Sequence, residues 1–117
     1  MITPHIVEVS NAKWTIYISG QVAINVDGHI VGNGDLGTQT CQVFENIKVA
    51  LEASELNFND VVKLTFFLTD ISQMAIVRDI RDQYINTNNP PASSAVEVNK
   101  LINNKLLIEI EAIAVAN

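Results

Sequence analysis

The sequence predicts an α+β fold with the element order ββαβαββ, in which one mixed sheet carries two helices on one face. Two observations support this class. Short runs rich in β-branched and aromatic residues have the length and alternation of strands, and two longer segments between them repeat apolar residues every three or four positions, as helices do. A chain of 117 residues has room for one hydrophobic core, so we expect a single domain over residues 1–117.

The N-terminal part is expected to hold two paired strands and an irregular loop. Residues 6–9 form a short apolar run that ends at a turn-forming Ser-Asn pair, and residues 14–19 alternate large apolar with mixed residues. Asp27-Gly28 indicates a tight turn, and the glycines that follow favour irregular backbone up to about residue 37.

Two helices are predicted from the three- and four-residue spacing. The first begins at about Thr38 and ends near Ser54, and the stripe that should face the sheet is Leu36, Thr40, Val43, Phe44, Ile47, Ala50 and Leu51. The second begins at Asp70, which can form a reciprocal cap with Gln73, and ends at residues 88–91, where two prolines follow two asparagines. Its buried stripe should be Met74, Val77, Ile80 and Tyr84.

Three more strands complete the predicted sheet, at residues 61–69, 92–98 and 106–115, with an Asn-Asn turn between the last two. The first of these runs is apolar on both sides, and the last begins in the same way. Two amphipathic helices cover only one face of a sheet, and an apolar face left open favours contact with another chain. The pattern therefore predicts self-association.

Charge and composition exclude several classes of function. Seven basic against thirteen acidic side chains give a net charge of −6, and the lysines are scattered, which disfavours nucleic-acid binding as a primary role. No apolar run could span a membrane. The lack of an export signal and the single cysteine, Cys41, favour a cytoplasmic location. No histidine and cysteine spacing suggests zinc, the glycines do not form a phosphate loop, and nothing resembles a catalytic triad.

Four groups of segments, in this order along the chain, resemble the RidA/YjgF family. Together they cover nearly the whole chain, and their combination at the family's spacing is far more specific than any single segment. They are Ser19-Gly20-Gln21, residues 42–48, residues 60–70, and the pair formed by residues 91–98 and 108–115.

The resemblance implies a chorismate mutase-like fold that assembles as a homotrimer, with a small-molecule cleft between neighbouring subunits. It also implies hydrolysis of reactive imines and enamines, such as 2-iminopropanoate and 2-iminobutanoate, without metal or cofactor. In the family, an arginine binds the substrate carboxylate, two main-chain N–H groups hold the substrate, and a glutamate on the last strand positions the attacking water. The corresponding main-chain donors here are those of Gly20 and Ala95, and the glutamate is Glu109.

This chain departs from the family at the carboxylate-binding position. Ser93 stands where the family has its arginine, and Ala95 stands where a cysteine is common. Serine lacks the charged, planar fork with which arginine binds a carboxylate. Losing such a contact commonly costs roughly 2–5 kcal/mol, so we expect activity on imino acids to be reduced or lost.

Three further side chains have both a functional and a structural interpretation. Arg78 replaces an asparagine that lines the family's cleft, and it either binds the substrate anion from the opposite wall or pairs at the surface with Asp79, Asp82 or another subunit's carboxylate. His5 either carries a proton at the mouth of the cleft or faces solvent. Glu109 either acts as a general base toward water or accepts structural hydrogen bonds.

These observations leave three hypotheses of function. The chain is an imine or enamine deaminase without the usual carboxylate anchor, or a metabolite-binding or regulatory trimer that has kept the cleft but not the chemistry. The third is an endoribonuclease or translation inhibitor, an activity reported for relatives, which the acidic charge balance disfavours.

Overall fold

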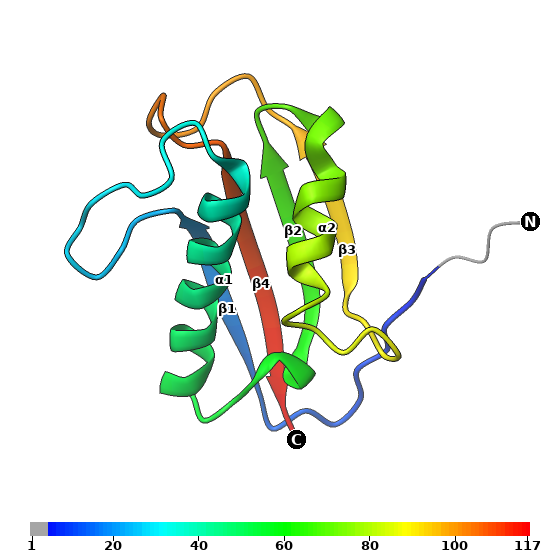
Figure 1. Ribbon diagram of the computed structural model, residues 1–117. Helices are drawn as coiled ribbons and strands as arrows, with labels where there is room; N and C mark the ends of the chain where they lie inside the picture. Colours follow the sequence, from blue (N-terminus) through cyan, green and yellow to red (C-terminus); the bar gives the residue numbers. More distant parts are fainter. Residues whose placement is uncertain (1–4) are drawn as a thin grey trace, which may run out of the picture.

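The chain is described here by a computed structural model that covers residues 5–117, and it confirms the predicted α+β class. Within these residues the elements are β1 (Trp14–Val22), α1 (Leu36–Ala53), β2 (Val61–Leu68), α2 (Met74–Arg81), β3 (Ala92–Glu97) and β4 (Ile108–Ala116). Two 3₁₀ turns, η1 (Phe58–Asp60) and η2 (Ile71–Gln73), precede β2 and α2. Both helices lie on the same face of the sheet, as predicted (Figure 1).

The sheet has the order β1-β4-β2-β3. The C-terminal strand β4 lies in the middle and is antiparallel to both β1 and β2, whereas β2 and β3 run parallel. Thus β1 and β3 form the two edges, and β3 is separated from β4 by β2 although the two follow each other in the chain.

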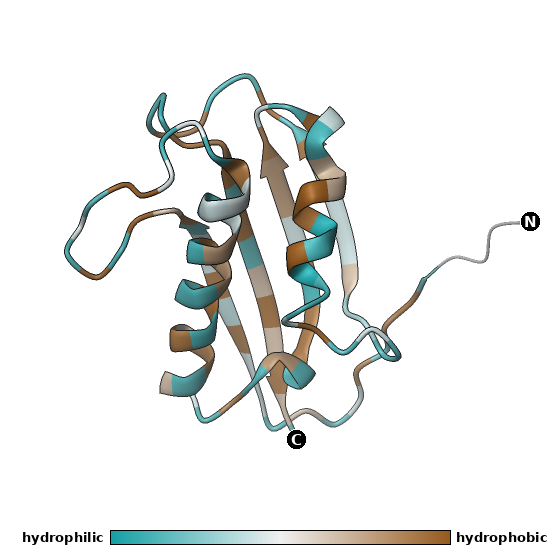
Figure 2. Cartoon of the chain, viewed as in Figure 1, coloured by the Kyte–Doolittle hydropathy of each residue, from teal (hydrophilic) through white to brown (hydrophobic). Residues whose placement is uncertain are grey.

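The core lies between the sheet and the helices. Alternation along β2 directs Leu64, Phe66 and Leu68 toward the helices, and all three are fully buried. Figure 2 shows the apolar residues concentrated along β2 and β4. The buried apolar side chains that α1 and α2 contribute are Leu36, Val43, Phe44, Ile47, Leu51, Met74 and Val77, which belong to the two predicted stripes.

The first helix begins slightly earlier than predicted, at Leu36, because Asp35 caps it. The Asp35 carboxylate accepts hydrogen bonds from Thr38 N at 3.1 Å and from Thr38 Oγ1 at 2.8 Å. The bond from the Thr38 main chain, followed by that from its hydroxyl, holds the pKa of Asp35 below its usual value.

A buried glutamine fastens this helix to the loops at one end of the sheet. The Gln39 side chain donates to Gly32 O at 3.1 Å and to Lys105 O at 2.8 Å, and it accepts from Leu107 N at 2.8 Å. All three partners are main-chain groups of loops, so one amide satisfies polar atoms that would otherwise be unpaired.

The predicted first strand is wrong, and the order of elements is therefore βαβαββ. Within residues 5–117, residues 6–9 pair with no strand, and Ile6 is 77% exposed. The backbone turns at Asn11, which has a φ of 57°. The preceding segment leads away from β1 to the opposite edge, where His5 Nε2 lies 3.0 Å from Pro90 O. Apolar alternation shows which residues could share a face, but it does not supply a partner strand.

The second helix is shorter than predicted, because it ends at Arg81. Tyr84 lies beyond it, in a turn, where its ring stacks on Phe44 with centroids 4.9 Å apart and its hydroxyl donates to Glu45 Oε2 at 2.7 Å. Burial and the Glu45 hydrogen bond raise the pKa of Tyr84. Asp70 acts as a cap, but of η2, by accepting from Ser72 N at 3.1 Å.

The sheet face opposite the helices carries both polar and apolar side chains. Lys63 and Thr65 of β2 are polar and alternate onto it, together with the apolar Phe67, and the register places Ile113 of β4 and Val96 of β3 on the same face. Tyr17 of β1 is 77% exposed on the same face, and we call this surface the open face.

Neither α1 nor α2, the helices of residues 5–117, combines the length and apolar content needed to cross a membrane.

Candidate functional site

Glu109 lies on the open face, where alternation along β4 places it. Its neighbours Ile108 and Ile110 are fully buried on the helix side, so the intervening side chain points the other way. The Glu109 side chain is half-buried, and within residues 5–117 no hydrogen-bond donor satisfies its carboxylate. The carboxylate is therefore available to accept hydrogen bonds from a water molecule or a ligand.

Gly20 lies directly beneath this carboxylate. A Cβ atom placed on Gly20 would be 2.6 Å from the Glu109 carboxyl carbon and 3.0 Å from its Cγ, which is closer than real Cβ contacts allow. Gly20 also lies in a β-bulge, because Ser19 and Gly20 together face the single residue Glu111 of β4. A bulge leaves main-chain groups outside the ladder, so this position combines a close approach with free peptide groups.

The main chain of β3 provides a second set of donors at the opposite edge. Val98 N donates to Leu68 O at 2.8 Å, toward β2. In a parallel ladder alternate residues direct their peptide groups to opposite sides, so the N–H groups of Ser93 and Ala95 point away from β2, along the free edge. Both residues are exposed. The N–H of Ala95 is therefore directed outward from the sheet edge whatever its side chain, and its role as a substrate donor stays a prediction.

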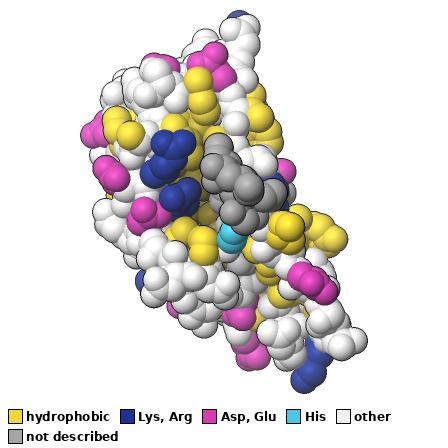
Figure 3. Space-filling model, turned by 90° about the vertical axis from the view of Figure 1, so that its right-hand side faces the viewer, with side chains coloured by type: hydrophobic (Ala, Val, Ile, Leu, Met, Phe, Trp, Pro, Cys, Tyr) yellow, Lys and Arg dark blue, Asp and Glu magenta, His cyan; other side chains and the backbone are white. Residues whose placement is uncertain are grey.

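Arg78 and His5 lie on the same side of the molecule as this edge. His5 is exposed and contacts Pro90, two residues before β3 begins. In the described part of the chain, Arg81 forms an ion pair with Asp82 at 2.9 Å, whereas Arg78 forms none. The ion pair with Asp82 is thus made by Arg81, and the pairing of Arg78 with another subunit's carboxylate stays a prediction. Figure 3, which views this side, shows basic side chains gathered near a histidine.

The sequence-predicted site residues fall into two groups that one chain does not bring together. Ser93 pairs in register with Leu64, whose side chain faces the helices, whereas Glu109 pairs with Phe67 on the open face. Two whole strands, β2 and β4, also separate β3 from the Gly20 region of β1. One group therefore consists of Gly20 and Glu109, and the other of His5, Arg78, Ser93 and Ala95.

Lys63 is a cation beside β3 that sequence reasoning did not assign to the site. Its Nζ donates to Ser94 Oγ at 2.8 Å across the β2–β3 pair. The signal was present, because a lysine in an otherwise apolar strand must direct its charge to a polar partner or to solvent.

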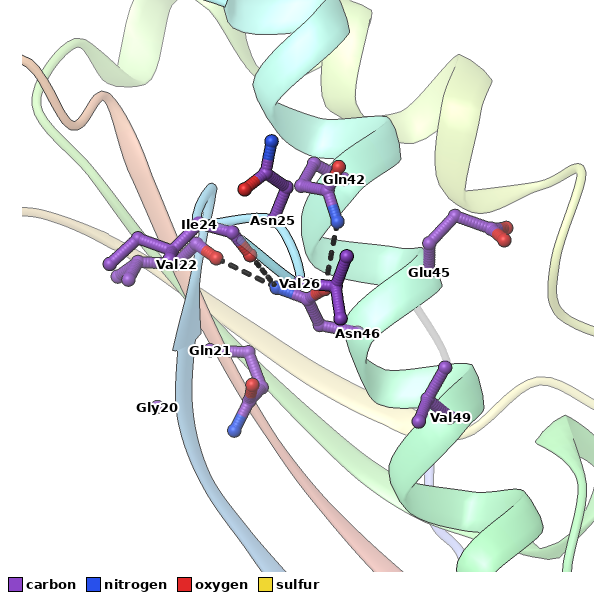
Figure 4. Close-up of a pocket in the computed structure, with 10 residues that line it drawn as sticks. All are labelled: Gly20, Gln21, Val22, Ile24, Asn25, Val26, Gln42, Glu45, Asn46 and Val49. Atoms are coloured by element: carbon purple, nitrogen blue, oxygen red, sulfur yellow. Dashed lines mark hydrogen bonds between the residues drawn. The ribbon is translucent and has the colours of Figure 1, made fainter. Parts of the chain in front are cut away.

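A cavity of about 610 Å³ lies on the helix side of β1, next to Gly20 (Figure 4). Its polar wall is an amide pair on α1: Asn46 Nδ2 donates to Val22 O and Ile24 O, each at 3.0 Å, and Gln42 Nε2 donates to Asn46 Oδ1 at 2.8 Å. Sequence reasoning missed this cavity, because polar residues on a helix usually indicate a solvated face. In residues 5–117 no three His, Cys, Asp or Glu side chains are grouped so as to hold a metal ion.

Comparison with known protein families gives a match over nearly the whole chain. The Endoribonuclease L-PSP family model matches residues 4–116. A RutC family protein of Pyrococcus horikoshii is 41% identical over 99 residues, which cover 85% of this chain and 77% of that protein.

Solved structures show the same fold. A Rid family protein of Yersinia pestis, YyfB, is similar with a TM-score of 0.85 and 34% identity, over 92% of this chain and 82% of that one. RidA from an Antarctic Psychrobacter is similar with a TM-score of 0.79 and 35% identity, over 93% of this chain and 84% of that one.

Proposed function

This chain belongs to the Endoribonuclease L-PSP family, to which the RidA/YjgF proteins belong, and from that premise we propose that it hydrolyses reactive imines or enamines of small metabolites in clefts between copies of a homotrimer. The observation that carries the proposal is the free, half-buried carboxylate of Glu109 lying against Gly20.

The separation of the site residues favours a cleft made by two copies. Gly20 and Glu109 lie near one edge of the sheet and on its open face, whereas Ser93 and Ala95 lie on the other edge. If the β3 edge of one copy meets the β1 side of the next, both groups line one cleft. A closed ring of such head-to-tail contacts uses each edge once per copy, as a cyclic trimer requires.

The chemistry needs a positioned water and hydrogen-bond donors. The Glu109 carboxylate accepts a proton from water as the oxygen attacks the imine carbon and passes it to nitrogen, which gives the neutral carbinolamine. It then moves the hydroxyl proton of the carbinolamine to nitrogen in the same way, and the C–N bond breaks as the carbonyl forms. One water is consumed, the C–N bond breaks, and a carbonyl compound and ammonia are released. Main-chain N–H groups at Gly20 and at Ala95 of the neighbouring copy hold the substrate, in positions that side-chain changes do not alter.

Ser93 can contribute less to binding a substrate carboxylate than an arginine at the same position. A neutral hydroxyl offers one hydrogen bond where a guanidinium would offer two and a full charge. We therefore expect weaker hydrolysis of 2-iminobutanoate than in a relative that carries the arginine.

The same substitution favours a second candidate function, a metabolite-binding or regulatory trimer without catalysis. In that case the cleft binds a small keto acid or amine saturably, but Glu109 accelerates no reaction. An endoribonuclease is the weaker alternative, because thirteen acidic side chains oppose seven basic ones.

The test combines assembly with turnover. Light scattering after size-exclusion chromatography should give three copies, and 2-iminobutanoate generated in situ from an amino acid should release ammonia faster with the protein than without it. Glu109→Gln should abolish most of this acceleration. Glu111→Gln is the matched control, because Glu111 is exposed on the same strand and the same face.

Three results would count against the proposal. A stable monomer would remove the shared cleft. An unchanged rate for Glu109→Gln would remove the role of the carboxylate. Saturable ligand binding with no acceleration by the wild-type protein would favour the non-catalytic trimer.

A further inference from the structure

We infer that Arg78, on α2, binds the carboxylate of the ligand in place of the strand residue at position 93, so that the site accepts small 2-oxo and 2-imino acids. This inference rests on the proposed function, since it concerns the same cleft. Four features of the structure carry it: the side of α2 on which Arg78 lies, its level along β3, its lack of a carboxylate partner, and the donors beside it.

Arg78 lies on the flank of α2 that faces away from α1. On the near flank, Ile76 Cγ2 and Ile80 Cδ1 lie 3.9 and 3.8 Å from a Cβ placed on Gly37 of α1. At about 100° per residue, Arg78 is roughly 200° around the helix from both isoleucines. Because α1 lies over β1 and β4, and α2 lies beside it on the same face of the sheet, the flank away from α1 is the side of the β3 edge (Figure 1).

The level of Arg78 along β3 follows from a hydrogen bond that fixes the two elements together. Ile71 N, at the start of η2, donates to Glu97 Oε1 at 3.0 Å, at the end of β3. From that point the helix and the strand run in opposite chain directions. The seven residues to Arg78 span roughly 12 Å of 3₁₀ and α-helix. Four strand residues back from Glu97, to Ser93, span roughly 13 Å. Arg78 is therefore level with residues 93–95.

The charges around this edge leave Arg78 free for a ligand. Arg81 forms an ion pair with Asp82 at 2.9 Å. Lys63 donates a hydrogen bond to Ser94 Oγ on the open face of β3. The neighbouring carboxylate of Glu97 is used by Ile71 N. In the described part of the chain, Arg78 is the arginine of α2 without a carboxylate partner.

The donors beside Arg78 suit a carboxylate. The N–H groups of Ser93 and Ala95 point along the free edge, and the exposed Ser93 hydroxyl adds a third donor. A planar guanidinium approaching from the helix side can bind two carboxylate oxygens while the edge donors hold the 2-oxo or 2-imino group. The cation is therefore retained in the site, but it comes from α2 rather than from β3.

Binding of stable keto acids tests this inference separately from catalysis. Calorimetric titration of the assembled full chain with 2-oxobutanoate, and with its uncharged amide, would be compared for wild type, Arg78→Ala, Arg78→Lys and Arg81→Ala. We expect Arg78→Ala to weaken 2-oxobutanoate about ten- to hundred-fold and to leave the amide within about two-fold. Arg78→Lys should recover part of the loss, because it restores the charge without the fork. Arg81→Ala is the matched control.

The results separate the two proposals. Unchanged keto-acid affinity in Arg78→Ala, an equal loss in Arg81→Ala, or no keto-acid binding by the wild type would each overturn the role of Arg78. None of these bears on whether Glu109 is needed for ammonia release. Should Arg78→Ala fail to fold, the comparison of Arg78→Lys with wild type decides, and equal affinities would overturn the inference. Recovery of affinity in Arg78→Ala/Ser93→Arg would show that the two positions serve one ligand group.

Discussion

The close approach of Gly20 to Glu109 gives a prediction in which folding and activity separate. Gly20→Ala keeps the main-chain N–H of residue 20 but adds a methyl group beneath the Glu109 carboxylate. We expect the variant to assemble and to unfold within about two degrees of the wild type, and yet to lose most of its imine hydrolysis. The fold tolerates the change because the displaced atoms are the end of a flexible side chain.

The size of the effect follows from the geometry. The added carbon would lie 2.6 Å from the Glu109 carboxyl carbon, whereas ordinary carbon–carbon contacts are about 3.5–4.0 Å. The carboxyl group must therefore move by roughly 1 Å. A misplacement of that size commonly costs about a hundred-fold in rate. At 1.36 kcal/mol for each factor of ten, this is about 2.7 kcal/mol of transition-state stabilisation.

The assay is kcat/KM for ammonia release from 2-iminobutanoate, measured in a Glu109→Ala background as well as in the wild type. If Gly20→Ala acts by moving the carboxylate, it should add almost nothing once the carboxylate is gone. A rate for Gly20→Ala within about two-fold of the wild-type rate would refute the reasoning. A further hundred-fold loss when Gly20→Ala is added to Glu109→Ala would refute it as well.

Three other changes have defined outcomes. In an Arg78→Ala background, Ser93→Arg should raise kcat/KM on 2-iminobutanoate about ten- to hundred-fold over Arg78→Ala alone, and Ser93→Lys should raise it less; equal gains would show that charge alone matters. Gln39→Leu leaves three loop main-chain groups without their partner, so denaturant unfolding should show a loss of roughly 2–4 kcal/mol, and a loss under 0.5 kcal/mol would contradict this. Asp35→Ala should lower Tm at pH 7. Because the folded-state pKa of Asp35 is lowered, its contribution is present above its unfolded pKa near 4 and is lost as pH falls through the lower folded value. The Tm difference from wild type should therefore narrow in acid, and a constant difference would exclude the charged cap as its cause.

The sequence predicted secondary structure best where the pattern depends only on residues close together in the chain. The stripe that includes Val43, Phe44 and Ile47 predicted α1, because the helical period depends on neighbours along the chain. It predicted secondary structure least well where contact with a distant part of the chain determines whether a strand or helix forms. Residues 6–9 alternate like a strand but pair with no strand in the part of the chain that the structure describes. Tyr84 continues the α2 spacing although the helix ends three residues earlier.

The candidate site divides in the same way. Glu109 and Gly20 could be assigned from motif and alternation, and their contact could not, because a bulge in β1 sets it. Within residues 5–117 Arg81 has a carboxylate partner in Asp82, which the spacing of the two arginines does not indicate. The depth of the cavity beside β1 depends on where the loop after Val22 folds back, and Asn46 holds that loop by two hydrogen bonds that no periodicity predicts.

The outward-facing peptide groups of β3 have a consequence for how such a protein can change its ligand. Every residue type other than proline presents the same N–H at positions 93 and 95, so these two main-chain donors stay in place whatever the side chain. The side chain that recognises the ligand can therefore change on β3, or be supplied by α2, while the main-chain donors that hold the ligand are unchanged. A chain built in this way can alter its selectivity by one side chain at a time.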